Sequence, residues 1–332
     1  MKRQQCSNCM FSSWYHNFKN CTFKSKIIKL TSDFIDYLNS DGIILPVVEE
    51  TRYSNTLEEY SDEDDWNSDD RDTDVIPSFP QLKLEVDNAI KELGGAVFPK
   101  LNWSSPKDAA WITHNGTLKC SSFNDICLLL KSSDFVTHDL TSAYDYCEDS
   151  TEPHPKDQFE LVLREWCDVM PGMEFRCFVR QNKLVGISQR HYSQFFDYLV
   201  KNKNVYVEEI IDFYNSKLKC KFADLDYTFD VYKGKNNDYF LIDFNPFGLK
   251  TDSLLFSWKE LHKTEISSVD QKNDSFFRIV TSSNGIQPSP YITYGMPKDV
   301  VDLSSGEDIN KMIDFFRVKD LIAKPDDKEF EK

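Results

Sequence analysis

The residues with the clearest chemical potential lie in a predicted β-hairpin at residues 227–247. Two runs of aromatic and β-branched residues flank a Gly-Lys-Asn-Asn turn, which is a sequence pattern typical of a hairpin. Folding the chain between Asn236 and Asn237 places Asp230 opposite Asp243. Like charges that face each other across two strands destabilise a sheet, so this pair needs a cation.

The alternation of side chains along each strand gives this hairpin two faces. Thr228 falls opposite Asn245, and Asn245 shares one face with Asp230 and Asp243. The other face is predicted to be apolar and to consist of Phe229, Val231, Ile242 and Phe244. The polar face offers three hard oxygen ligands, which suit Mg²⁺ completed by water and phosphate oxygens better than a closed protein cage. The alternative is a set of solvent-facing acids on an edge hairpin.

A second hairpin is predicted at residues 173–190, with a Gln-Asn turn. Glu174 and Arg176 share a face of its first strand, so an acid can orient Arg176 to offer two parallel donors to a phosphate. The alternative is an exposed ion pair worth ~0–1 kcal/mol. The face taken by Arg190 depends on the register of the turn, which the sequence leaves open.

A polar loop at residues 100–108 follows a short strand predicted at residues 96–99. It carries Lys100 and Lys107 together with small hydroxyl side chains. Such a loop can wrap a polyphosphate, with the lysines as point charges and the N–H groups as a nest. The alternative is a surface turn. The chain lacks Gly-x-x-x-x-Gly-Lys-Ser/Thr and Gly-x-Gly-x-x-Gly, which argues against P-loop and Rossmann nucleotide sites.

A strand predicted at residues 159–167 ends in Arg164-Glu165-Trp166-Cys167. The main-chain groups of this run could pair with the edge of an adenine, while Trp166 is interpreted as a core residue.

The nine cysteines are odd in number and scattered, which indicates reduced thiols rather than a disulfide framework. Cys6 and Cys9 have the spacing of a zinc pair. However, no second Cys or His pair has matching spacing, and the sequence does not favour a metal site there.

Composition narrows the class of partner and compartment. The 332 residues include 39 basic and 55 acidic side chains, a net charge of −16, which argues against nucleic acid or an anionic membrane as the main partner. No apolar run approaches the ~20 residues of a membrane helix. The basic N-terminus has no apolar stretch behind it, so no secretory signal is predicted. These observations predict a cytoplasmic protein that binds neither membrane nor, directly, nucleic acid.

The chain is expected to fold as two lobes with an insert and a tail. Between Glu58 and Asp74 ten acidic residues stand against one arginine, which is typical of a disordered loop. Helices are predicted at 82–93, 123–131 and across 192–218. The expected segments are 1–49 (N-terminal part of the first lobe), 50–76 (acidic disordered insert), 77–163 (rest of the first lobe with the polar loop), 164–262 (second lobe with the metal site) and 263–332 (polar, largely disordered tail with an amphipathic helix at 309–322).

Several runs of the sequence, taken together, closely resemble the cell division cycle protein 123 family. The resemblance spans about residues 11–262 and includes the acidic insert after the N-terminal Phe-Ser-x-Trp-Tyr. The runs are Phe98-Pro99-Lys100-Leu101-Asn102-Trp103-Ser104, Leu163-Arg164-Glu165-Trp166-Cys167, Pro171-Gly172-Met173-Glu174-Phe175-Arg176-Cys177-Phe178, Gly186-Ile187-Ser188-Gln189-Arg190 and Leu241-Ile242-Asp243-Phe244-Asn245-Pro246-Phe247-Gly248.

The resemblance implies an α/β (α+β) ATP-grasp fold, in which two lobes with antiparallel sheets enclose a nucleotide. It further implies a monomeric, ATP- and Mg²⁺-binding chaperone that promotes assembly of eukaryotic translation initiation factor two by binding its gamma subunit. Carried over residue by residue, it assigns nucleotide contacts to Lys100, Trp103, Ser105, Lys107, Arg164, Glu165, Cys167, Glu174, Arg176, Arg190, Asp230 and Asp243, and Mg²⁺ coordination to Asp230, Asp243 and Asn245.

One departure bears on catalysis. ATP-grasp ligases usually carry Glu-x-Asn-x-Arg on the last strand, where the Arg assists an acyl-phosphate intermediate. This chain has Asp243 in place of the Glu and Phe247 in place of the Arg. Either carboxylate can bind Mg²⁺, so the metal role is expected to survive while substrate activation is not supported. A binding chaperone is therefore favoured, and the alternative is an ATP-grasp ligase or kinase acting through a phosphorylated intermediate.

Overall fold

The computed structural model describes residues 1–46, 77–113, 115–149, 159–236, 238–264, 275–283 and 286. All of them belong to one compact unit, Met1–Ser289. The acidic insert predicted at 50–76 and the helix predicted at 309–322 lie outside the described residues. Within the described part of the chain, no helix is both long and apolar enough to cross a membrane.

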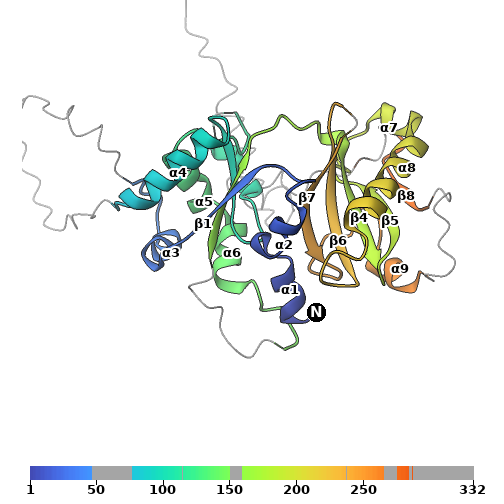
Figure 1. Cartoon of the computed structure of the whole chain (residues 1–332), viewed down its shortest axis with the longest axis horizontal. Coiled ribbons are helices and arrows are strands. Elements are labelled where there is room, and N and C mark those ends of the chain that lie inside the picture. Colours follow the sequence, from blue (N-terminus) through green and yellow to red (C-terminus); the bar gives the residue numbers. More distant parts are fainter. Residues whose placement is uncertain are drawn as a thin grey trace, which may run out of the picture. The chain divides into compact units, whose positions relative to one another are not determined.

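The first sheet has three antiparallel strands in the order β1-β3-β2 (Figure 1). They are β1 (Ser25–Lys29), β2 (Val97–Lys100) and β3 (Glu160–Glu165). The central strand is buried on both faces: Leu161 and Leu163 enter a core formed with helices, whereas Val162 belongs to the core of the second sheet. By alternation, Arg164 therefore points away from the helices of the first sheet.

Two helices on the first sheet begin and end close to where their sequences predict. The predicted helices at 82–93 and 123–131 are confirmed as α4 and α5, and Ser122 caps α5 by accepting the N–H of Asp125. Helix α6 was not predicted, because its few apolar residues give a weak period. The elements are α3 (Ser32–Asn39), α4 (Pro80–Glu92), the 3₁₀ turn η2 (Lys107–Ile112), α5 (Phe123–Lys131) and α6 (Asp134–Ser142).

The second sheet has five strands in the order β7-β6-β4-β5-β8. They are β4 (Glu174–Arg180), β5 (Lys183–Gln189), β6 (Tyr227–Lys233), β7 (Tyr239–Pro246) and β8 (Phe277–Arg278), the first of them preceded by the 3₁₀ turn η4 (Pro171–Met173). All pairings are antiparallel except that of β5 with β8. Both predicted hairpins are confirmed, and the turn between β4 and β5 has positive φ at Gln181 and Asn182, as a tight hairpin turn requires.

Helices cover one face of this second sheet (Figure 1). They are α7 (Asp197–Lys201), α8 (Lys203–Phe213) and the π-turn η5 (Tyr214–Leu218), which divide the stretch predicted as helical at 192–218. Phe175 and Phe229 point into their core. Arg176 and Asp230, one residue further along each strand, consequently face the opposite side, where Phe178 packs with α9 (Trp258–Lys263).

Two boundaries expected from the sequence need correction. The N-terminal segment 1–49 was assigned to the first lobe, but α2 (Phe11–Phe18), which follows α1 (Arg3–Asn8), packs on the second sheet. The Phe244 ring of β7 lies 5.3 Å from Trp14 and 5.2 Å from Phe18. An aromatic cluster in a sequence shows that a segment is folded, but it does not show which sheet it covers.

The second correction concerns the tail predicted from residue 263. Strand β8 lies inside that segment and pairs with β5, and Phe277 is 1% exposed in the core. A two-residue strand in a polar stretch has too short a period to be read from the sequence.

Candidate functional site

The hairpin of β6 and β7 brings the predicted metal ligands together. Asp230 is paired with Asp243 and Thr228 with Asn245, which confirms the predicted register. The pairing of Lys233 with Tyr239, however, centres the turn on Asn236, whereas the sequence predicted a centre between Asn236 and Asn237. A β-bulge between the two halves of the hairpin adds one residue to β7 and restores the expected opposition of the two acids.

The same bulge makes one predicted orientation wrong. Ile242 was expected in the apolar face, but it is the extra residue of the bulge, between Leu241 and Asp243, and is only half-buried. Leu241 takes the core position instead and is fully buried. A bulge breaks the alternation of side chains along a strand, so period two fails at this point.

Asp230 is held by arginines. Arg176 lies opposite it on β4, and its Nε and Nη2 donate to the two carboxylate oxygens at 2.7 and 2.8 Å. Arg176 also donates from Nη1 to the carbonyl of Asp252 at 2.9 Å, and Nε of Arg190 lies 3.7 Å from Asp230 Oδ2. Burial raises the pKa of Asp230, but Arg176 and then Arg190 outweigh it, so the pKa falls below its usual value. Arg176 is 4% exposed, which excludes the surface ion pair considered from the sequence.

Asp243 is held by a lysine from the other sheet. Lys100, at the end of β2, places Nζ 2.5 Å from Asp243 Oδ2, and this lysine is only 2% exposed. The other carboxylate oxygen accepts the N–H of Phe244 at 3.1 Å. Burial lowers the pKa of Lys100, whereas Asp243 acts in the opposite direction. The loop lysine predicted to bind phosphate therefore lies directly beside a predicted metal ligand.

The donor set has the chemistry that Mg²⁺ prefers. Asp230, Asp243 and Asn245 supply carboxylate and amide oxygens on adjacent positions of one hairpin, and a carboxylate oxygen that accepts one hydrogen bond retains a second lone pair. A metal at this place competes with Arg176 and Lys100. Among the described residues, no group of three or more His, Cys, Asp or Glu side chains could hold a metal, so this two-carboxylate set depends on water or phosphate oxygens for the remaining ligands.

Glu174 extends the charged cluster. Its Oε2 lies 3.5 Å from Nε2 of His191. Burial raises the pKa of Glu174, but His191, the exposed Lys107 and Arg190 outweigh it, so the pKa is lowered. The acid expected to orient Arg176 was Glu174; the structure gives that role to Asp230 and pairs Glu174 with a histidine that the sequence analysis did not identify.

The loop after β2 is fixed by an acid that was also missed. Asp139 of α6 is buried and accepts the N–H of Ser104 at 2.7 Å, the Ser104 hydroxyl at 2.8 Å and the N–H of Trp103 at 3.3 Å. The indole of Trp103 donates to the carbonyl of Cys6 at 2.9 Å. Two of the N–H groups predicted to bind phosphate, those of Trp103 and Ser104, therefore donate to Asp139 instead. Ser105 is half-buried, and its backbone carbonyl accepts the N–H of Lys107 at 2.7 Å.

In the run predicted to face an adenine, some of the main-chain groups already form hydrogen bonds within the protein. The N–H groups of Glu165 and Trp166 donate to the carbonyls of Lys24 and Ala96 at 2.9 and 3.0 Å. The Glu165 carboxylate accepts the N–H of Lys24 at 2.9 Å, and Cys167 is half-buried. Arg164 is fully buried, and its side chain bonds to β7 instead of reaching the loop.

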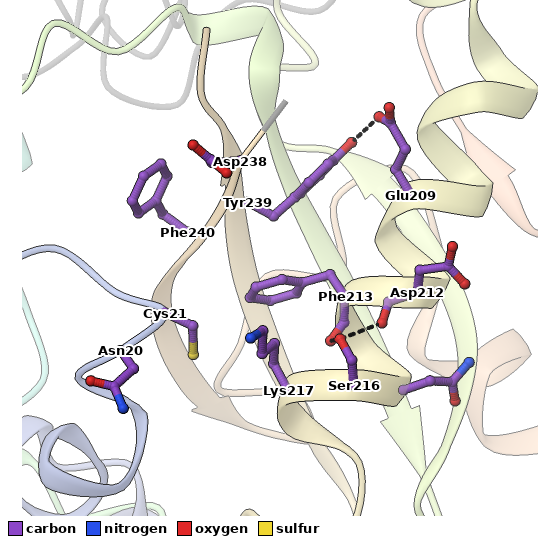
Figure 2. Close-up of a pocket in the computed structure, with 11 residues that line it drawn as sticks. Asn20, Cys21, Glu209, Asp212, Phe213, Ser216, Lys217, Asp238, Tyr239 and Phe240 are labelled. Carbon is purple, nitrogen blue, oxygen red and sulfur yellow. Dashed lines mark hydrogen bonds between the residues drawn. The ribbon is translucent and has the colours of Figure 1, made fainter. Parts of the chain in front are cut away.

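A concavity lies elsewhere on the second lobe, away from the charged cluster. A cavity of about 830 Å³ is lined by the end of α8, the π-turn, the start of β7 and Cys21 (Figure 2). Figure 2 shows Tyr239 pointing toward Glu209, whose carboxylate accepts the tyrosine hydroxyl at 2.9 Å and also pairs with Lys233. None of the predicted site residues lines this cavity.

Fold and site together define a mixed α/β protein in which two mainly antiparallel sheets contribute charged residues to one cluster. A family model described as D123 matches residues 14–304, and the chain belongs to this family.

The relatives and one solved structure agree with this assignment. The chain is 46% identical over 330 residues to the "Translation initiation factor eIF2 assembly protein" of Xenopus tropicalis, covering 96% of this chain and 97% of the relative. It is 39% identical over 315 residues to "Cell division cycle protein 123" of Candida glabrata, covering 90% and 87%. The structure of Cdc123 from Schizosaccharomyces pombe is similar with a TM-score of 0.70 and 37% identity, covering 85% of this chain and 99% of that chain.

These matches confirm the resemblance to the cell division cycle protein 123 family. The match in fold also confirms the predicted class, α/β with antiparallel sheets, which the resemblance equated with the ATP-grasp fold.

Proposed function

We propose that this chain is an ATP- and Mg²⁺-binding chaperone that promotes assembly of translation initiation factor eIF2. The proposal rests on one structural observation: Asp230 and Asp243 lie opposite each other, flanked by Arg176, Arg190 and Lys100. Carboxylates surrounded by cations on two sheets suit a ligand that is itself a metal–phosphate complex, because such a ligand offers both a cation and anionic oxygens.

Each charged residue then has a defined task. Asp230, Asp243 and Asn245 would hold Mg²⁺, and Lys100, Arg176 and Arg190 would face phosphate oxygens together with the exposed Lys107. Bound Mg²⁺ neutralises phosphate charge and links the nucleotide to the hairpin. Glu174, whose carboxylate lies 3.5 Å from His191, would add a negative charge beside the basic residues that face the phosphates.

Phe247 favours binding over phosphoryl or acyl transfer. It stands where ATP-grasp ligases carry an arginine, and its ring packs 4.9 Å from that of Trp258 and 5.3 Å from that of His262. An aromatic ring held in this way supplies no donor to an acyl phosphate. ATP would instead stabilise one arrangement of the chain, through its differential affinity for that arrangement.

The partner is inferred from the relatives. The Xenopus tropicalis protein is described as an eIF2 assembly protein. We propose that this chain acts on the same factor and, as the family resemblance implies, holds its gamma subunit. All nine cysteines are free, which fits the reducing cytoplasm, where we place this monomeric chaperone.

Calorimetry with ATP and Mg²⁺ tests the site. We expect the parent to bind ATP in a Mg²⁺-dependent manner and Asn245→Ala to bind about tenfold more weakly, as expected for a lost metal contact. Asn236→Ala, in the exposed turn of the same hairpin, is the matched control and should bind like the parent. Absence of Mg²⁺-dependent ATP binding by the parent would refute the proposal.

Radiolabelled ATP with purified gamma subunit distinguishes a chaperone from a ligase or kinase. We expect stoichiometric binding of nucleotide and ATP-dependent capture of the subunit, without continuing release of ADP, AMP or pyrophosphate. Steady turnover, or label transferred to the subunit, would show that the chain acts as an enzyme and not as a chaperone.

A further inference from the structure

Arg164 occupies an unusual place for a charged residue. It lies on the central strand β3 and is 1% exposed. Its guanidinium group lies over three aromatic rings, 5.2 Å from the centre of Phe11 and 5.3 Å from those of Phe23 and Phe98. Burial lowers its pKa to about 10, so the group stays charged at neutral pH. A cation in such a place needs a specific reason, because its desolvation is costly.

The hydrogen bonds of Arg164 reach across to the other sheet. Nη1 donates to the carbonyl of Ile242 at 2.7 Å, and Nη2 donates to Thr22 Oγ1 at 2.9 Å and to the carbonyl of Leu241 at 3.5 Å. Thr22 in turn donates its hydroxyl to the Leu241 carbonyl at 2.6 Å. A side chain of the three-stranded sheet is therefore bonded to the edge strand of the five-stranded sheet.

The backbone that Arg164 holds is that of the bulge residue Ile242. Ile242 is the extra residue on β7 that brings Asp243 opposite Asp230. A bulge loses ladder hydrogen bonds with its neighbouring strand and bends locally, so its geometry needs support from outside the ladder. Arg164 supplies that support on the outer side of β7, beside the bridge that Leu241 forms with Thr22. Asp243 also favours the charged form of Arg164, which places the two charges within electrostatic reach.

We propose that Arg164 is a positioning residue: its guanidinium group clamps the β7 bulge and thereby fixes Asp243 relative to Asp230. The metal part of this inference rests on the proposed function, whereas the clamp itself does not. Arg164 acts through the backbone of β7, and its side chain need not touch a nucleotide. This changes the role that the family resemblance assigned to it.

The clamp also explains why the two sheets share one site. The side chains of Lys100 on β2 and Arg164 on β3 donate hydrogen bonds to two consecutive residues of β7. Lys100 donates to the Asp243 carboxylate and Arg164 to the Ile242 carbonyl. A shift of the first sheet relative to β7 would therefore move the bulge and the ligand together. The geometry of the metal ligands and the contact between the two sheets therefore change together.

Arg164→Lys tests the clamp, because lysine keeps the charge but cannot span two carbonyls. The matched control is Arg180→Lys: Arg180 also donates to two backbone carbonyls, those of Leu261 and Thr264, at 3.5 and 3.0 Å. If Arg164→Lys does not fold, Thr22→Val removes the bridging hydroxyl at nearly constant volume. Amide hydrogen exchange of residues 239–246, Mn²⁺ affinity in the presence of ATP, and ATP affinity in EDTA are measured on each protein.

We expect exchange at residues 241–244 to be about tenfold faster in Arg164→Lys, as for the loss of one charged hydrogen bond, and unchanged in Arg180→Lys. Mn²⁺ affinity should fall by about tenfold, while ATP affinity in EDTA stays within about twofold of the parent. Thr22→Val should show the same pattern, less strongly.

The readouts separate the clamp from the proposed function. Unchanged exchange at residues 241–244 in both Arg164→Lys and Thr22→Val overturns the clamp. Equal losses of Mn²⁺ affinity and metal-free ATP affinity overturn the positioning role and make Arg164 a direct nucleotide contact. If the parent binds no Mn²⁺ and no ATP, the proposed function fails and the metal role of Arg164 fails with it, while the exchange data still decide on the clamp.

Discussion

At the scale of residues, the site is built from acids that each have a cation. The sequence predicted two opposed carboxylates that would need a cation between them. In the structure Arg176 and Lys100 supply that compensation, and both are almost completely buried. A buried ion pair adds little to stability, because desolvation offsets the attraction, but removing one member leaves an uncompensated charge. The cluster is therefore sensitive to single substitutions.

Asp243→Ala is expected to abolish Mg²⁺-dependent ATP binding and to destabilise the fold. Relief of the repulsion between the two opposed carboxylates would by itself leave the fold intact. The buried Lys100 changes that expectation: without its partner it should cost about 3 kcal/mol of unfolding free energy. Urea denaturation and calorimetry measure both effects.

The control for this prediction is Asp238→Ala, an exposed acid beside the same strand, which should change neither quantity. Adding Lys100→Met to Asp243→Ala should restore part of the stability but none of the ATP binding. A single Asp243→Ala variant as stable as the parent would show that Lys100 finds another partner or water.

At the scale of elements, the hairpin of β6 and β7 shows what a sequence can and cannot predict. Alternation and the turn residues identify the strands and the opposed acids, because both are local properties. The bulge is not local: the edge strand is held by Thr22 and Arg164, which come from distant parts of the chain. Period two therefore places Ile242 in the core, where the structure places Leu241.

The same limit applies to the loop after β2. Its lysines and hydroxyls predict a phosphate-binding loop, but which of its N–H groups remain available depends on α6. Asp139, which engages those of Trp103 and Ser104, is separated from them by more than thirty residues. No motif marks such an anchor, and only the packing of α6 against the loop reveals it.

Asp139 makes the stability of this element depend on pH. Burial raises its pKa to about 6, although its hydrogen bonds from Ser104 act in the opposite direction. Because the folded-state pKa exceeds the unfolded value, the folded chain holds a proton between about pH 4 and 6 that the unfolded chain has lost. The contribution of Asp139 to stability is therefore present at low pH and is lost as the pH rises through 6.

Asp139→Asn should remove this dependence, because the amide mimics the protonated acid. We expect the unfolding free energy of the variant, relative to the parent, to rise by up to about 3 kcal/mol from pH 4 to pH 6.5 and then to level off. Urea denaturation at four pH values measures it. Asp134→Asn, at an exposed position on the same helix, serves as the control. A difference that does not vary with pH would mean that Asp139 is charged throughout.

At the scale of the whole molecule, the folded body extends beyond the point at which the sequence pattern fades. Phe276 and Phe277 are buried, and the ring of Phe277 lies 5.6 Å from that of Phe175 on β4. Arg278 bonds to Glu260 of α9 at 3.1 and 3.3 Å and so ties β8 to α9. These contacts cover the edge of β5, which would otherwise end the sheet.

Two truncations test where the body ends. A chain that stops at residue 262 loses both phenylalanines and the whole of β8. Removal of a single buried Phe ring costs about 3–5 kcal/mol, so we expect a large drop in melting temperature and weakened ATP binding.

A chain that stops at residue 286 retains β8 and every residue of the charged cluster, and we expect parental melting and ATP affinity. Calorimetry of both truncations, each with and without Mg²⁺-ATP, provides the comparison. If the chain of 262 residues melts like the parent, β8 contributes nothing to the sheet. If the chain of 286 residues also fails to fold, residues beyond it support the body, and the nucleotide site depends on them as well.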